Sequence, residues 1–89
     1  MNMPEYQLLN QLTELSHITE EFEKEAKWRF AQKKAIRKAH LEIERLLIEG
    51  RYKDILIRVN EYMKNNHLGK YYVVLHHKAI EWRSINDTY

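Results

Sequence analysis

The sequence predicts an all-α fold, a small antiparallel bundle of three to four helices with one long central helix at about residues 20–49. Three observations lead to this prediction. No glycine or proline occurs between Glu5 and Glu49, so this run of good helix formers contains no helix-breaking residue. Apolar residues recur at helical spacing along most of the chain. The 89 residues are enough for one small core, and we expect a single domain over residues 1–89.

A first, short helix is expected at about residues 4–16. Pro4 suits the first turn of a helix, because its missing N–H would have no partner there. Four leucines follow at helical spacing, namely Leu8, Leu9, Leu12 and Leu15. Thr19 then offers a good N-cap, because three glutamates follow it closely. We favour a break at residues 16–19 over the alternative of one continuous rod.

The long helix expected at about residues 20–49 would measure roughly 45 Å. A helical wheel places seven residues on one apolar face, namely Trp28, Ala35, Ile36, Ala39, Ile43, Leu46 and Leu47. Three further apolar residues fall off this face, near the lysines, namely Phe30, Leu41 and Ile48. A helix with apolar residues on two sides is expected to contact more than one neighbour. Gly50 is placed to end it.

Two more helices complete the expected bundle, at about residues 52–65 and 70–83, followed by a frayed tail at 84–89. The segment from Tyr71 to Leu75 also suits a strand, but no second strand is available to pair with it. Trp82 is expected to pack in the core.

Composition limits the possible functions. The chain has no cysteine, which excludes disulfides and thiol catalysis and suits a cytoplasmic protein. No apolar stretch approaches the roughly 20 residues of a membrane span. The formal net charge of +2 is too small for the whole domain to be a general binder of polyanions.

Catalytic and metal-binding patterns are missing from the sequence. The five histidines lack the spacing of metal ligands, and Ser16 and Ser84 have no glycine-built elbow around them. We therefore expect no enzymatic activity, no cofactor and no metal site. His40 lies at the edge of the apolar face and is expected to be a packed ring with one hydrogen bond.

The sign of the charge changes along the chain. Residues 14–25 carry five acids and one base, whereas residues 27–38 carry six bases and no acid. The basic segment has three interpretations: an ordinary solvated face, a surface for nucleic-acid phosphates, or a surface for an acidic protein. In the third case the partner is another protein or an antiparallel second copy of this chain.

We expect a non-catalytic protein-interaction module that binds and modulates, for example inhibits, a larger protein with an acidic surface. A second copy of this chain, in a dimer, is the other expected partner. Small helical chains of this kind occur in phages and other mobile elements, so we expect such an origin. The alternative is nucleic-acid binding through residues 27–38; no membrane partner is expected. The residues expected to contact the partner are Arg29, Phe30, Lys33, Lys34, Arg37, Lys38, Tyr71 and Tyr72.

Overall fold

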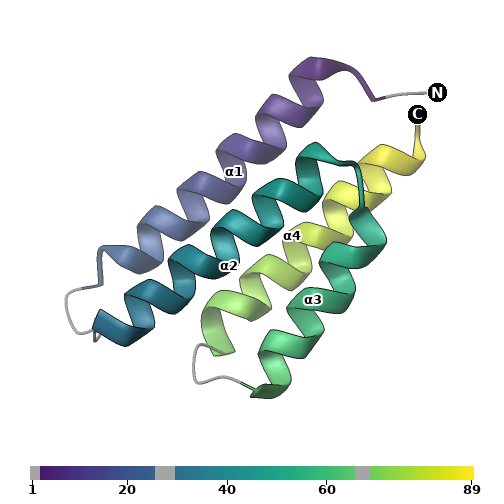
Figure 1. Ribbon diagram of the computed structural model, residues 1–89. Helices are drawn as coiled ribbons and strands as arrows, with labels where there is room; N and C mark the ends of the chain where they lie inside the picture. The colour runs from purple at the N-terminus through teal and green to yellow at the C-terminus, as the bar shows by residue number, and fades with distance from the viewer. Residues whose placement is uncertain (1–2, 26–29, 66–68) are drawn as a thin grey trace.

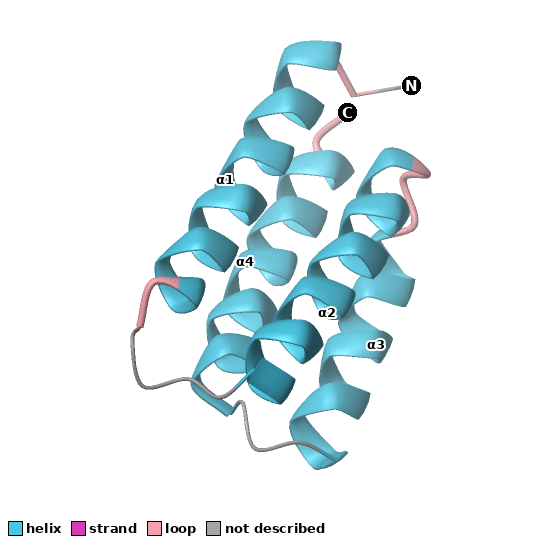
Figure 2. Ribbon diagram, turned by 60° about the vertical axis from the view of Figure 1, so that its left-hand side comes forward, coloured by secondary structure: helices cyan, strands magenta, loops and turns pink. Residues whose placement is uncertain are grey.

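The protein is an antiparallel bundle of helices. The computed structural model describes residues 3–25, 30–65 and 69–89, and over these residues it contains four helices and no strand. The helices are α1 (Glu5–Glu23), α2 (Phe30–Ile48), α3 (Tyr52–Asn65) and α4 (Gly69–Asp87). Two antiparallel pairs, α1 with α2 and α3 with α4, lie side by side (Figure 1). Contacts of α1 with α4 and of α2 with α3 complete the bundle (Figure 2), so the predicted all-α fold is confirmed.

The core consists of the apolar faces that helical spacing picks out. Of the predicted α2 face, Trp28 lies outside the described residues and Ala35 is half-buried, while Ile36, Ala39, Ile43, Leu46 and Leu47 are buried. The other helices add Leu15, Tyr52, Ile55, Val59, Tyr71, Tyr72, Leu75, Ala79 and Trp82. Trp82 is fully buried, as predicted.

The first two helices differ from the sequence prediction in their boundaries. α1 continues through residues 16–19 and ends at Glu23, so there is no break at Thr19. The expected helix over residues 20–49 is likewise wrong at its start, because residues 20–23 belong to α1, which runs antiparallel to α2. The physical reason is tertiary: Thr19 is fully buried, and its hydroxyl bonds to other helices instead of capping a new one.

Gly50 ends the α2 helix, as the sequence predicts. Its φ of 72° is in the left-handed region that favours glycine. The Arg51 N–H donates to the Leu46 carbonyl at 2.9 Å, and the Gly50 N–H donates to the Leu47 carbonyl at 3.0 Å. This pair of bonds is the Schellman motif, which satisfies the last carbonyls of a helix and turns the chain into α3.

The C-terminal segment is more ordered than the predicted frayed tail. α4 extends to Asp87, and the Thr88 hydroxyl donates to the Ile85 carbonyl at 2.6 Å. At the end of the chain, the Tyr89 hydroxyl accepts a hydrogen bond of 3.4 Å from the Gln7 side chain on α1. The last residue of the chain therefore contacts α1, which local sequence does not indicate.

Candidate functional site: the outer face of α2

The outer face of α2 brings together most of the residues that the sequence singled out for partner binding. We call the set the α2 patch; it comprises Phe30, Lys33, Lys34, Arg37, Lys38 and Leu41. These residues recur at intervals of three and four along the helix, so they share one side. The opposite side of α2 is buried in the core. The patch is thus a direct consequence of the two-sided apolar pattern of this helix.

The α2 patch surrounds a shallow hollow of about 550 Å³ that is open to solvent. Its walls are almost entirely carbon, because long basic side chains present their aliphatic stems while their charged ends reach into water. Phe30 closes one end and is 83% exposed; Leu41 closes the other and is 57% exposed. Exposed apolar side chains among charges are typical of a contact surface.

The apolar character of this face extends beyond the hollow. Ile48 is 59% exposed and follows Phe30 by 18 residues, which is five full turns of helix, so the two side chains are aligned on the same side of α2. Leu41 lies between them along the helix. The outer face therefore carries a line of three exposed apolar side chains, with the bases concentrated between the first two.

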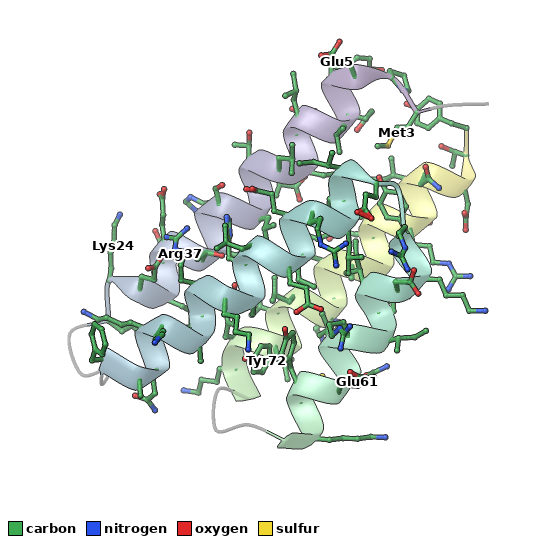
Figure 3. The ribbon with its side chains drawn as sticks, viewed as in Figure 1. Met3, Glu5, Lys24, Arg37, Glu61 and Tyr72 are labelled. Carbon is green, nitrogen blue, oxygen red and sulfur yellow. The ribbon has the colours of Figure 1, made fainter. Side chains whose placement is uncertain are left out.

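Three of the four bases in the α2 patch have no ionic partner among the described residues. Arg37 forms an ion pair with Glu23 of α1, which fixes the guanidinium at the edge where the two helices face each other (Figure 3). Lys33, Lys34 and Lys38 are exposed and make no ion pair with any residue that the structure describes. The patch therefore presents positive charge that is not neutralised within the described chain.

Elsewhere in the bundle, ion pairs also join neighbouring helices. Lys78 of α4 lies 2.6 Å from Glu14 of α1, and Arg58 of α3 lies 2.5 Å from Glu42 of α2. These contacts connect neighbouring helices near the surface, where such pairs contribute modestly to stability. Lys53, Lys64, Lys70 and Arg83 likewise make no ion pair with any described residue. The lysines of the α2 patch differ from them in lying around an apolar hollow.

Two of the predicted partner-binding residues are not on the surface. Tyr71 and Tyr72 are 0% and 1% exposed, so the prediction that they contact a partner is corrected. The Tyr72 ring stacks on Tyr62 with centroids 5.0 Å apart, and Tyr71 meets Phe22 edge-on at 5.3 Å. Figure 3 shows Tyr72 between α3 and α4. Arg29, also predicted for the site, lies outside the described residues.

A buried hydrogen-bonded chain links three helices beneath the α2 patch. The Thr19 hydroxyl lies 2.8 Å from Nδ1 of His40 and 2.9 Å from the Tyr71 hydroxyl. Nε2 of His40 lies 3.3 Å from the carboxylate of Glu44. His40 is thus a packed ring as predicted, but with partners at both nitrogens. One signal in the sequence could have indicated this chain: Thr19 follows Leu15 by four residues and so lies on the buried side of α1.

Burial changes the acidity of the groups in this chain. Desolvation lowers the pKa of His40 below its ordinary value of 6.5; Arg37 acts in the same direction, while Glu44 and Glu23 oppose it. Burial also raises the pKa of Tyr71 to about 12. His40 and Tyr71 are therefore both neutral at physiological pH. The arrangement of this hydrogen-bonded chain suits a structural role in joining α1, α2 and α4.

The described residues outside the α2 patch offer little chemistry. Across residues 3–25, 30–65 and 69–89, no group of three His, Cys, Asp or Glu side chains is placed to hold a metal ion. A second hollow, of about 580 Å³, lies where the start of α1 meets the turn between α2 and α3, and Met3 and Tyr52 are part of its lining. Among the described helices, none has the length and apolar character needed to cross a bilayer.

Comparisons of this chain with protein-family models, with curated proteins and with solved structures find no match.

Proposed function

We propose that this protein is a small binding module that uses the α2 patch to hold an acidic surface on a larger protein. The observation that carries the proposal is the set of three exposed lysines, Lys33, Lys34 and Lys38, between two exposed apolar side chains. None of the three pairs with an acidic residue in the part of the chain that the structure describes. Basic groups attract an acidic surface and orient it. Apolar side chains at the ends of the patch supply buried contact area once the surface is covered.

The apolar part of the α2 patch favours a protein over a nucleic acid. A phosphate backbone is bound through charge and gains little from a carbon-walled hollow closed by Phe30 and Leu41. Protein interfaces combine an apolar centre with charged residues at the rim. Binding of this kind modulates the larger protein by covering its acidic surface, and inhibition follows where that surface is needed for activity.

The proposal is tested by affinity capture from the organism that encodes the chain, with three versions of the protein as bait. The first is the wild type. The second carries Lys34→Glu and Lys38→Glu in the α2 patch. The third carries Lys53→Glu and Lys64→Glu, a control with the same change of charge at exposed positions of α3. Each capture is carried out with and without nuclease treatment of the lysate.

We expect at least one protein to be captured by the wild type and the α3 control and lost with the α2 variant. The captured protein should carry an acidic surface. The same proteins captured by all three baits would contradict the proposal. Capture that is lost on nuclease treatment would favour nucleic acid as the partner instead.

A further inference from the structure

The arrangement of the α2 patch also indicates the shape of the partner. Four residues at positions i, i+3, i+4 and i+7 on a helix surround a hole that accepts one side chain from a facing helix. Phe30, Lys33, Lys34 and Arg37 form one such hole. Lys34, Arg37, Lys38 and Leu41 form the next one along the helix. Among the described residues, those that line the hollow are the members of these two overlapping holes.

We infer that the α2 patch binds an acidic amphipathic helix of the partner protein, which inserts two apolar side chains, three or four residues apart, into the two holes. This inference rests on the proposed function, because it assumes an acidic protein partner. The lysines lie on both sides of the hollow, Lys33 with Arg37 in one row and Lys34 with Lys38 in the other. Acidic residues that flank the inserted side chains of the partner helix meet these rows.

The backbone of α2 supports a helix over an extended strand as the partner element. Within a helix, the N–H and C=O groups bond to one another, so α2 offers no edge for strand addition, and recognition depends on side chains. A partner helix running along α2 also reaches beyond the hollow. Ile48 lies about 27 Å from Phe30 along the axis and offers a third apolar contact to a helix of five turns.

Charge complementarity indicates that the partner helix carries negative charge. Arg37 is paired with Glu23 and remains about half exposed, while the three lysines are unpaired in the described chain. A basic or neutral helix would leave these lysines facing like charges or an apolar surface, which is unfavourable. An acidic helix satisfies them and at the same time buries Phe30 and Leu41.

The experiment compares synthetic peptides of about 20 residues, long enough to be helical when capped, by NMR titration of the ¹⁵N-labelled full chain. The first peptide carries two leucines at i and i+4 with glutamates at the flanking positions. The second has the same composition, but its leucines are placed at i and i+2, on different sides of the helix. A third is the first peptide with a central proline that prevents helix formation. A short DNA duplex is titrated in parallel.

We expect the first peptide to bind at least about tenfold more tightly than the second and third, with the largest shifts at residues 30–41. Equal binding of all three peptides would overturn the inference of a helical partner and leave the proposed acidic protein partner standing. Binding of the duplex alone would overturn both. Failure of every probe to bind would overturn the helix inference, and the affinity capture described above would then decide on the proposed function separately.

Discussion

Thr19 of α1 and His40 of α2 are joined in the bundle interior by a hydrogen bond of 2.8 Å between the Thr19 hydroxyl and Nδ1 of the imidazole. The neighbouring groups fix its direction. Nε2 faces the Glu44 carboxylate and so carries the proton, which makes Nδ1 the acceptor and the Thr19 hydroxyl the donor. The Thr19 oxygen then accepts from the Tyr71 hydroxyl, 2.9 Å away. Every hydroxyl and ring nitrogen in this chain has a partner while His40 is neutral.

Protonation of His40 is expected to destabilise the fold. A proton on Nδ1 would turn this acceptor into a donor and leave one buried hydroxyl without an acceptor. The pKa of His40 is lowered from 6.5 in the folded state, so the unfolded chain binds the proton more readily. The free energy of unfolding should therefore be constant above pH 6.5 as far as His40 is concerned, and fall as the pH drops below that value.

This pH dependence is measured by urea unfolding of the wild type and of His40→Gln between about pH 7.5 and pH 5. We expect a smaller loss of stability on acidification in the variant. His17→Gln, at an exposed position of α1, serves as the control and should keep the wild-type slope. Equal slopes for the wild type and His40→Gln would show that His40 does not carry the effect.

Removal of the Thr19 hydroxyl should cost more than removal of an exposed one. Thr19→Val keeps the shape of the side chain but leaves His40 Nδ1 and the Tyr71 hydroxyl without their partner, and we expect a loss of about 1–3 kcal/mol in the free energy of unfolding. Thr13→Val is the matched control, because its hydroxyl is exposed and bonds only to the Leu9 carbonyl of the same helix. A change within about 0.5 kcal/mol is expected there. Similar losses for both variants would contradict this account of the buried chain.

The two glycines should respond differently to alanine. Gly50 has a φ of 72°, so Gly50→Ala should lower the free energy of unfolding by about 1–2 kcal/mol. Gly69 begins α4 without a positive φ, and a Cβ there would meet no atom within 4 Å. Gly69→Ala should be neutral or stabilising by up to about 1 kcal/mol. Thermal unfolding of both variants tests these two expectations. A greater loss of stability in Gly69→Ala than in Gly50→Ala would contradict the conclusion that the position of Gly50 requires glycine.

Substitution of Leu41 should weaken partner binding without a large change in stability. Its side chain is 57% exposed, so Leu41→Ser is expected to change the free energy of unfolding by less than about 0.5 kcal/mol. The same variant should weaken binding of the acidic helical peptide, because it removes one end of the α2 patch. Leu47→Ala in the core should instead cost about 2–5 kcal/mol. A large loss of stability in Leu41→Ser would place that side chain in the core and not in a binding surface.

The α2 patch could be predicted from the sequence because both sides of α2 show in its pattern. Apolar residues at helical spacing define the buried side, and the off-face Phe30 and Leu41 then stand out beside the lysines. The burial of Tyr71 and Tyr72 could also have been predicted from the sequence. Tyr71 precedes Leu75 by four residues, which puts it on the buried side of α4 together with that leucine.

The remaining errors concern features that depend on contacts between helices. Thr19 has the local properties of an N-cap, yet its hydroxyl bonds to residues 21 and 52 positions away. Beyond the end of α4, Tyr89 likewise bonds to Gln7, which is 82 positions away. Spacing along one helix cannot indicate such partners, because they depend on how the helices pack together.

The central claim is that the α2 patch holds an acidic protein surface. The most direct test reverses the charges on the two sides of the interface. The wild type and the variant with Lys34→Glu and Lys38→Glu are each titrated with the acidic helical peptide and with a version in which lysine replaces its glutamates. We predict that the wild type prefers the acidic peptide, that the variant loses it, and that the variant gains affinity for the basic one. Undiminished binding of the acidic peptide to the variant would contradict the account.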